Sequence, residues 1–345
     1  MLTRFRSHLD RFVFTPYFTP RKLANLIRAN ISYKLRKEVV SSFPYQMVVD
    51  PCNSCILRCP LCPTGKHTEG RKKSMMKYEQ FASLLDEVGA YLYEIYLYNW
   101  GESLLNSDIF RMIEHAHNRR IRTKLSSSLN YFKEGFADQL VTSGLDELII
   151  SLDGLCQETY EQYRRGGDFN TVVGAVKEIS AAKKRLHSKT PTLVWQFLVM
   201  RQNEHEVRDV PAFARELGVD DVRITPIRTD TAQEIFETDE QKIENSKQWL
   251  PEKESLSRFS YSSRKRVAAK RDCKYLWSMP AINPNGSLSP CCAVFPEKLD
   301  FGNVLEEGFR NVWNNEKYVS ARRVVAGKKA TVPTVCINCV RNGFI

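Results

Sequence analysis

The chain has 345 residues, 42% of them hydrophobic, and a formal net charge of +11. This length accommodates one large and one small domain around a sizeable core, so we predict a globular protein. No apolar run approaches the length of a membrane span, and the start, MLTRFRSHLDRF, lacks the apolar core of a signal peptide. Ten cysteines in ligand-like spacings then favour metal sites over disulfides, and we expect a cytoplasmic protein.

Residues 1–45 form a basic N-terminal arm. Up to Lys37 the arm holds nine Lys and Arg residues against a single acid, Asp10. Apolar residues between the basic ones fall near helical spacing, which predicts an amphipathic helix; they are Leu23, Leu26, Ile27, Ile31 and Leu35. Such a helix suits peripheral contact with an anionic membrane or an acidic partner, whereas nucleic acid is not an expected partner. We favour the alternative of a helix packed across the bottom of the main domain with a solvated basic face.

Residues 46–228 alternate short β-branched or aromatic runs with longer helical patterns, which predicts βα units on a parallel sheet. The predicted strands are 46–50, 93–100, 122–127, 147–152, 192–200 and 221–226. The predicted helices are 78–92, 108–119, 131–143, 171–186 and 206–217. Six such units fall short of the eight that close a TIM barrel, so we predict an α/β fold with a partial barrel. Reactive groups should then gather in the loops after the strands.

The last part of the chain differs from the barrel. Residues 229–255 hold eight acids against three lysines and show no strand pattern, which predicts an exposed acidic connector. Residues 256–345 carry the remaining cysteines with Gly and Pro punctuation, which is typical of a small domain stapled by metal.

Three cysteines follow the first predicted strand with CxxxCxxC spacing: Cys55, Cys59 and Cys62. Three thiolates ligate three irons of a cubic 4Fe-4S cluster and leave the fourth iron open for a small molecule. A zinc site would need a fourth ligand, and no His or Cys follows closely enough to supply one. The alternatives are a plain electron-transfer cluster and a chance grouping of thiols.

This spacing, directly after an apolar stretch, resembles the signature of radical S-adenosylmethionine (SAM) enzymes. The resemblance implies a splayed (βα)6 barrel, and a unique iron that chelates the amino and carboxylate groups of SAM. One electron, from a reducing partner such as flavodoxin or ferredoxin, would cleave SAM. The resulting 5′-deoxyadenosyl radical would abstract hydrogen from a substrate.

Further motifs carry the same resemblance. Gly101 and Glu102 follow the second strand and are similar to the family's GGE motif, with Trp100 in place of the first Gly. A carboxylate beside a flexible Gly suits an ammonium group, so Glu102 would hold the SAM amino group. A surface Glu in a turn is the alternative.

Polar residues after the third and fourth strands extend the expected SAM site. Ser126, Ser127 and Ser128 stand where relatives carry Ser-Thr-Asn or Thr-Asn-Gly, with Ser128 in place of the expected Asn. Their hydroxyls suit contacts with the ribose or carboxylate, for which we name Ser126 and Ser128 and leave Ser127 as an alternative. Ser151 and Arg164 belong to a run resembling the family's SLDG…YR..G.F, and would bind the ribose or carboxylate. An ordinary strand end and helix cap would also explain the run.

Four later cysteines make a second ligand set: Cys273, Cys291, Cys336 and Cys339. A hairpin with an Asn-Gly turn at Gly286 would carry the first two, and the CxxC pair would close the site. The arrangement resembles the Twitch subdomain, a shortened SPASM domain with one auxiliary 4Fe-4S cluster. Structural zinc is the rival interpretation, and Cys292 competes with its neighbour as ligand.

The resemblance implies an oxidoreductase with SAM and two 4Fe-4S clusters. We predict hydrogen abstraction from a small sugar-, cyclitol- or lipid-linked substrate, with the auxiliary cluster accepting an electron, because no peptide-binding winged-helix segment is evident at the N-terminus. Alternatives are maturation of a ribosomally made peptide and a redox-neutral epimerisation with Cys156 as hydrogen donor. Cys156 is otherwise an inert residue at a helix start. A cluster-bearing electron-transfer or binding protein is the alternative from another class.

Overall fold

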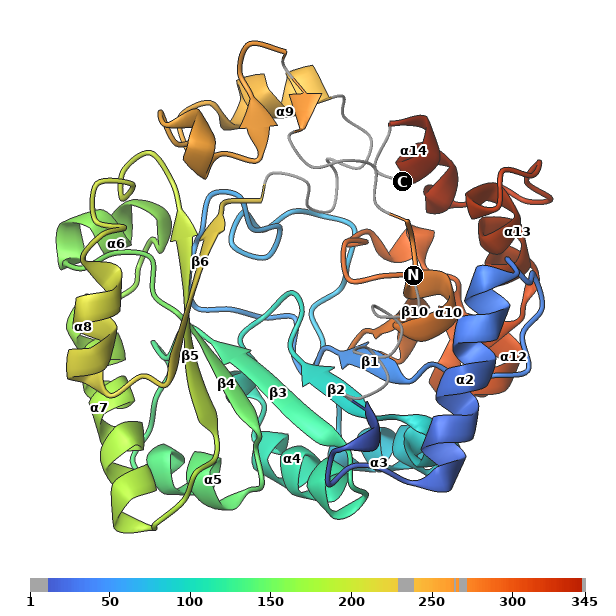
Figure 1. The fold of residues 1–345 in the computed structure, drawn as a ribbon, viewed down its shortest axis with the longest axis horizontal. Helices are drawn as coiled ribbons and strands as arrows, with labels where there is room; N and C mark the ends of the chain where they lie inside the picture. The colour runs from blue at the N-terminus through green and yellow to red at the C-terminus, as the bar shows by residue number, and fades with distance from the viewer. Residues whose placement is uncertain (1–11, 229–238, 264, 267–271, 343–345) are drawn as a thin grey trace.

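The computed structural model describes residues 12–228, 239–263, 265–266 and 272–342. Its centre is a nine-stranded sheet with the order β11-β10-β9-β1-β2-β3-β4-β5-β6 (Figure 1). Strands β1 to β6 run parallel to their neighbours. They are β1 (Gln46–Val49), β2 (Glu94–Leu97), β3 (Arg122–Ser127), β4 (Glu147–Ser151), β5 (Thr192–Val199) and β6 (Asp221–Pro226). All six lie within the predicted ranges, which confirms the partial (βα)6 barrel.

Helices cover the convex side of this sheet (Figure 1). They are α3 (Tyr78–Val88), α4 (Ile109–Asn118), α5 (Phe136–Thr142), α6 (Gln157–Tyr163), α7 (Phe169–Arg185) and α8 (Val210–Leu217). In α4 the apolar residues recur with helical spacing, and this pattern predicted the helix; they are Ile109, Met112, Ile113 and Ala116. All four are fully buried, so the predicted apolar face is the one that packs on the core. The short and largely polar α6 was not among the predicted helix ranges, although a helix start at Cys156 was expected.

The barrel strands carry a network of ion pairs that the strand pattern did not predict. Lys124 on β3 pairs with Glu94 on β2 at 3.0 Å and with Glu147 on β4 at 3.4 Å. Arg223 on β6 also reaches Glu147, at 2.9 Å, although β5 separates their strands in the sheet. These ion pairs join side chains of β2, β3, β4 and β6, so the charges lie together on one face of the sheet.

The C-terminal segment continues the barrel sheet. Strand β9 (Ala281–Ile282) pairs parallel with β1, and β10 (Ser287–Ser289) pairs antiparallel with both β9 and β11 (Gly302–Asn303). Gly286 in the β9–β10 turn has a φ of +84°, a left-handed conformation that favours glycine, as the Asn-Gly pattern predicted. The hairpin does not carry both cysteines, because Cys273 precedes α10 (Tyr275–Ser278).

Further helices complete the C-terminal part: α11 (Val304–Glu307), α12 (Phe309–Trp313), α13 (Glu316–Val325) and α14 (Val335–Arg341). Two buried arginines join this part to the rest of the chain. Arg71 lies beyond the loop that carries Cys55, Cys59 and Cys62, which we call the cysteine loop, and it pairs with Asp300 at 2.9 Å. Arg322 on α13 donates to the carbonyl oxygens of Glu38, Leu276 and Trp313. The cysteine loop and the basic arm are therefore both anchored to the C-terminal part.

The predicted connector, 229–255, is only partly described, because 229–238 lie outside the described residues. It continues through α9 (Asp239–Ser246), and β7 (Phe259–Ser260) and β8 (Lys265–Arg266) form a separate small sheet after it. The expectation of an exposed segment is wrong at Trp249 and Leu250, which are buried in one apolar cluster with Leu57 and Leu61 of the cysteine loop. Apolar contact outweighs the acidic composition at these two positions.

The side chains of Arg71 and Asp300 are 1% and 6% exposed, so removing one charge leaves the other buried and unpaired. We expect Arg71→Met to lower the free energy of unfolding by about 3–5 kcal/mol, measured by anaerobic urea titration with circular dichroism. The control is Arg111→Met, because Arg111 pairs with Asp108 at the surface, where a pair contributes about 0–1 kcal/mol. Equal losses in the two variants would contradict this role of Arg71.

Candidate active site

The loop after β1 carries Cys55, Cys59 and Cys62 and is closely packed. The amide of Cys62 donates to the Cys59 carbonyl oxygen at 3.1 Å, and the Arg58 amide donates to the Arg165 carbonyl oxygen at 3.0 Å. A Cβ atom on Gly65 would lie 2.5 Å from the Cys59 nitrogen, so this turn accepts only glycine without rearrangement. Backbone contacts therefore fix the positions of the three thiols.

The three thiols influence one another electrostatically. Burial raises the pKa of Cys55 to about 12, and Glu102 and the thiolates of Cys59 and Cys62 contribute in the same direction. Burial also raises the pKa of Cys59, against the lowering effect of the Arg164 guanidinium. Thiolates are the metal-binding form, and only added positive charge makes three of them favourable together. This donor set fits an iron–sulfur cluster, whose irons supply that charge.

Gly101 and Glu102 lie directly against the cysteine loop. A Cβ atom on Gly101 would be 2.0 Å from the Cys52 carbonyl oxygen and 2.6 Å from that of Ser54. The Glu102 amide donates to the Ser54 carbonyl oxygen at 2.8 Å. The GGE-like motif therefore needs glycine at position 101, because the backbone after β2 lies directly against the backbone of the cysteine loop and leaves no space for a side chain.

The Glu102 side chain is 3% exposed and held by β3. The amide and the hydroxyl of Ser128 both donate to its carboxylate, at 2.9 and 2.8 Å. The structure thus makes Ser128 a positioning partner of Glu102, a relation that the sequence pattern did not predict. Ser126 and Ser151 lie near the carboxyl ends of β3 and β4, where the barrel rule placed them.

Arg164 forms a buried ion pair beside the thiols. Its Nε atom donates to Asp153 Oδ2 at 2.6 Å, and its Nη1 atom lies 4.0 Å from Cys59 Sγ. The Leu198 amide donates to the other Asp153 oxygen at 2.8 Å. Burial raises the pKa of Asp153 despite the opposing effect of Arg164. Asp153 therefore orients Arg164 and leaves one guanidinium edge toward the cysteine loop.

Asp50, at the end of β1, is a buried carboxyl group that the motif search missed. It is fully buried, and burial raises its pKa to about 7. The amide of Trp100 donates to Asp50 at 3.1 Å. Its place directly before the cysteine loop was visible in the sequence, but a lone Asp after a strand carries no distinctive signal.

The C-terminal cysteines gather in a second region. Burial raises the pKa of Cys336 well above its ordinary value, and Cys273, Cys339 and Cys291 raise it further. Cys336 and Cys339 share one face of α14, three residues apart. Within the described residues, no three His, Cys, Asp or Glu side chains converge tightly enough for a single metal ion. The sulfurs around a cubic cluster lie farther apart than those around one ion.

Cys291 and Cys292 have overlapping surroundings. The Cys292 thiolate, burial and the Cys291 thiolate raise the pKa of Tyr275, and burial and Cys292 raise the pKa of Tyr98 just after β2. Among the thiols that raise the pKa of Cys336, Cys291 is present and Cys292 is not. This electrostatic effect on Cys336 favours Cys291 over Cys292 as the fourth candidate ligand.

Cys156 lies at the start of α6, where its sulfur is 3.4 Å from the hydroxyl of Thr159. That hydroxyl donates to the buried Glu206 at 2.7 Å. This is the surrounding of a residue at a helix start, which the sequence analysis gave as the inert alternative.

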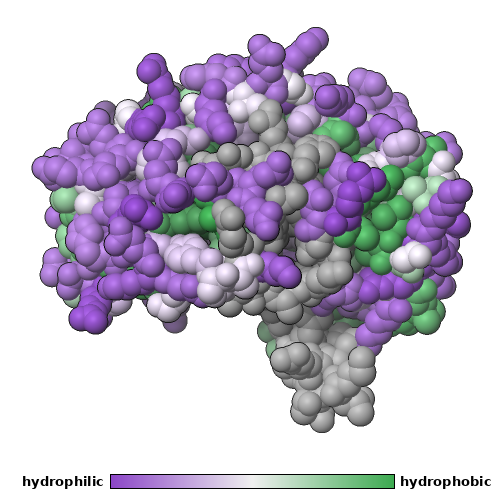
Figure 2. Space-filling model, turned by 90° about the horizontal axis from the view of Figure 1, so that it is seen from above, coloured by the Kyte–Doolittle hydropathy of each residue, from purple (hydrophilic) through white to green (hydrophobic). Residues whose placement is uncertain are grey.

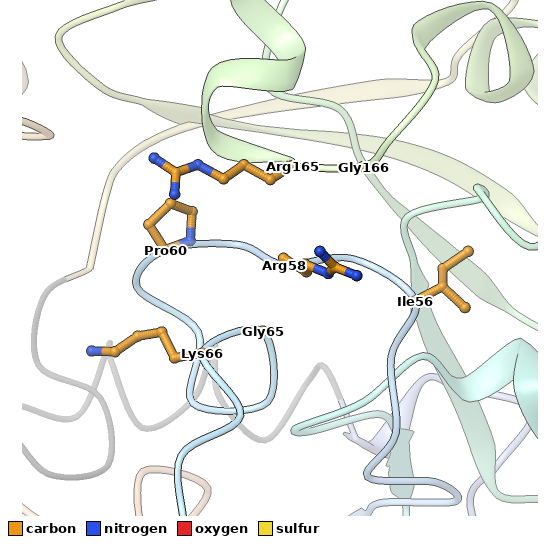
Figure 3. A pocket seen from close by; sticks show the side chains of 7 residues that line it. All are labelled: Ile56, Arg58, Pro60, Gly65, Lys66, Arg165 and Gly166. Atoms are coloured by element: carbon orange, nitrogen blue, oxygen red, sulfur yellow. The ribbon is translucent and has the colours of Figure 1, made fainter.

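A cavity of about 770 Å³ opens beside the cysteine loop (Figure 3). Its lining includes the exposed cations Arg58, Lys66 and Arg165, and the described residues form no ion pair with them. The remaining lining residues are Ile56, Pro60, Gly65 and Gly166. The cationic lining gives the cavity a positive potential, which suits an acidic protein or a small anion.

Comparison with protein families agrees with this geometry. Residues 49–214 match the radical SAM superfamily, and residues 273–340 match SPASM, an iron–sulfur cluster-binding domain. The chain belongs to the radical SAM superfamily and carries a C-terminal SPASM domain. Its cofactors are SAM, the 4Fe-4S cluster of the radical SAM domain, and iron–sulfur in the SPASM domain. The SPASM match favours iron–sulfur over the zinc interpretation.

Curated relatives and a solved structure are similar to this radical SAM protein. A probable GTP 3′,8-cyclase of Methanocaldococcus jannaschii is 28% identical over 48% of this chain, which spans about half (53%) of the cyclase. The mycofactocin maturase MftC of Mycolicibacterium smegmatis is 25% identical over 77% of this chain and 68% of its own length. The PqqA peptide cyclase of Gluconobacter oxydans is 22% identical over 79% of this chain and 76% of its own length.

The fold is shared with Streptococcus suis SuiB, in a structure bound to its precursor peptide SuiA. The TM-score is 0.59 at 15% identity, over 86% of this chain and 70% of SuiB. No described helix is long and apolar enough to span a membrane.

The contact at Gly101 gives a prediction for the radical SAM site. A methyl group there overlaps two carbonyl oxygens, so we expect Gly101→Ala to lose iron at the first site and to bind SAM more than about tenfold more weakly. Anaerobic reconstitution with iron analysis, and calorimetry with SAM, measure both effects. Gly174→Ala is the control, because α7 leaves open space at that position. Parent-like SAM affinity in Gly101→Ala would contradict the proposed contact.

Proposed function

We propose that this protein is a peptide-modifying radical SAM enzyme that abstracts hydrogen from a C–H bond of a ribosomally made peptide. The observation that carries the proposal is the similarity to the PqqA peptide cyclase and to MftC over more than three quarters of the chain. That similarity extends over a longer stretch than the radical SAM match at residues 49–214. It favours the peptide alternative over our first interpretation of a small sugar-, cyclitol- or lipid-linked substrate.

At the first site, different residues would bind the cluster and different parts of SAM. Cys55, Cys59 and Cys62 would hold the cluster, which together with bound SAM supplies a 5′-deoxyadenosyl radical. Glu102, fixed by Ser128, would accept hydrogen bonds from the SAM ammonium group. Arg164, fixed by Asp153, would bind the SAM carboxylate. Ser126 and Ser151 remain proposed ribose contacts.

The second cysteine set would hold one auxiliary cluster in the SPASM domain. Its proposed ligands are Cys273, Cys291, Cys336 and Cys339, supported by their mutual effects on pKa. The reducing partner, such as flavodoxin or ferredoxin, remains an expectation. The cationic cavity beside the cysteine loop supports it, because its charge attracts an acidic protein.

The substrate class is tested with the reconstituted full chain, SAM, dithionite and a synthetic copy of a precursor peptide encoded beside its gene. We expect peptide-dependent formation of 5′-deoxyadenosine, transfer of deuterium from a labelled peptide, and a changed peptide mass. The control reaction contains a scrambled peptide of equal composition. Deuterium transfer from a labelled nucleotide sugar or polyprenyl-linked sugar, with the peptide unchanged, would return the assignment to a small substrate.

The auxiliary cluster gives a separate prediction. If it accepts the substrate electron, Cys336→Ala/Cys339→Ala should still form 5′-deoxyadenosine but should lose the oxidised product. Circular dichroism and Mössbauer spectroscopy establish that the variant is folded and keeps its first cluster, because a metal-held domain can unfold without its metal. Cys156→Ala distinguishes the alternative: an oxidation leaves product formation intact, whereas an epimerisation that uses this thiol loses it. If the double variant formed the oxidised product in the same amount as the parent, the auxiliary cluster would not be the acceptor of the substrate electron.

A further inference from the structure

The basic arm contains helix α2 (Pro20–Lys34), which is fixed to the side of the barrel and packs against α10 and the short helix η1 (Gly89–Tyr91) (Figure 1). Leu26 and Ala29 are buried on its inner face. The Asn25 side chain accepts from the Phe43 amide at 2.9 Å and donates to the Phe43 carbonyl oxygen at 3.0 Å. The helix is therefore a fixed element with one face already occupied.

The outer face of α2 is also apolar, which agrees with the alternative of peripheral membrane contact and not with the favoured solvated basic face. Ile27, Ile31 and Leu35 recur every four residues and are 41%, 46% and 64% exposed, so they form one outward stripe. Phe14 before the helix and Val39 after it are 82% and 64% exposed. These five are nearly half of the eleven large hydrophobic residues that the described part of the chain exposes.

Figure 2 shows apolar side chains among hydrophilic ones on the right, the side on which Figure 1 places α2 and the C-terminal helices. A solvated basic face, which we favoured from the sequence, would not expose this apolar stripe. Folding has left these side chains outside the core although the same helix contributes Leu26 to it. An exposed apolar stripe of this kind marks an interaction surface.

The charged side chains of α2 itself are all positive. Helix α2 contains no Asp or Glu, and Arg21 and Arg28 on it are exposed without an ion pair among the described residues. Lys37, two residues beyond Leu35, is also exposed. The Arg36 side chain is held by Asp272, so the segment after the helix stays anchored to the body of the protein. The stripe therefore presents apolar groups between cations.

We propose that α2 and its exposed stripe bind the surface of an anionic lipid membrane. A helix that lies in the interface places apolar residues among the acyl chains and basic residues among the lipid phosphates, and this face offers both. A second copy of this chain is a poorer occupant, because a two-fold contact through α2 would bring equal positive charges together. The inference is independent of the peptide substrate and stands or falls separately from the proposed function.

The test is anaerobic co-sedimentation of the reconstituted full chain with vesicles of phosphatidylcholine alone and of phosphatidylcholine mixed with phosphatidylglycerol. We expect binding to the anionic vesicles that weakens at high ionic strength. Ile27→Ser/Ile31→Ser/Leu35→Ser should lower the apparent partition coefficient about tenfold or more, with unchanged circular dichroism. Ile31→Trp should show blue-shifted fluorescence on the anionic vesicles.

The matched control is Leu186→Ser, which removes a hydrophobic residue that is 38% exposed at the end of α7. It should bind the anionic vesicles as the parent does. Equal binding of the triple variant and the parent would overturn the proposal, as would binding to neutral vesicles alone. A parent dimer that the triple variant converts to a monomer, measured by light scattering, with no vesicle binding, would assign the stripe to a second copy.

Discussion

The active site depends on the backbone contact between the end of β2 and the cysteine loop. The Glu102 amide donates to the Ser54 carbonyl oxygen, and Gly101 lies so close to Cys52 that no side chain fits between them. This single contact fixes the proposed SAM-binding carboxylate relative to the three cluster thiols. It also explains why the second glycine of the family motif cannot change, whereas the ring of Trp100, in place of the first glycine, packs edge-on against Phe295.

Buried charge is the second constraint on the site. Arg164 and Asp153 are both removed from water, and an isolated buried charge would cost several kcal/mol. Their mutual contact offsets much of that cost and keeps a cation beside Cys59. The thiols themselves repel one another as thiolates, so cluster binding and loss of protons are coupled in both cysteine sets. The protein is thereby prepared for a group that brings positive charge.

The two cysteine sets are held by one sheet. The first follows β1, and Cys291 of the second follows β10, which is joined to β1 through β9. The buried Arg71–Asp300 pair ties the same two regions together by side chains. Their relative placement therefore results from strand pairing and buried charge. The described end of the acidic connector is also held to the cysteine loop, because Trp249 belongs to the same buried cluster as Leu57 and Leu61.

The sequence by itself determined the features that depend on local spacing. Apolar and β-branched runs defined the six parallel strands, the cysteine spacings indicated two ligand sets, and the Asn-Gly pattern predicted the turn at Gly286. Each of these signals is contained in a few neighbouring residues, whose backbone preferences and side-chain directions are set locally. Gly101 and Glu102 were found from their similarity to the family's GGE motif together with their position directly after a strand.

Only the tertiary structure decided which distant segments meet. The pairing of β9 with β1, the hold of Ser128 on Glu102 and the burial of Trp249 in an acidic stretch join residues far apart in the chain. The apolar residues of α2 gave one helical pattern, yet packing divided them between a buried face and an exposed stripe. Periodicity records that a side chain is apolar, whereas its burial depends on whether another segment arrives to cover it.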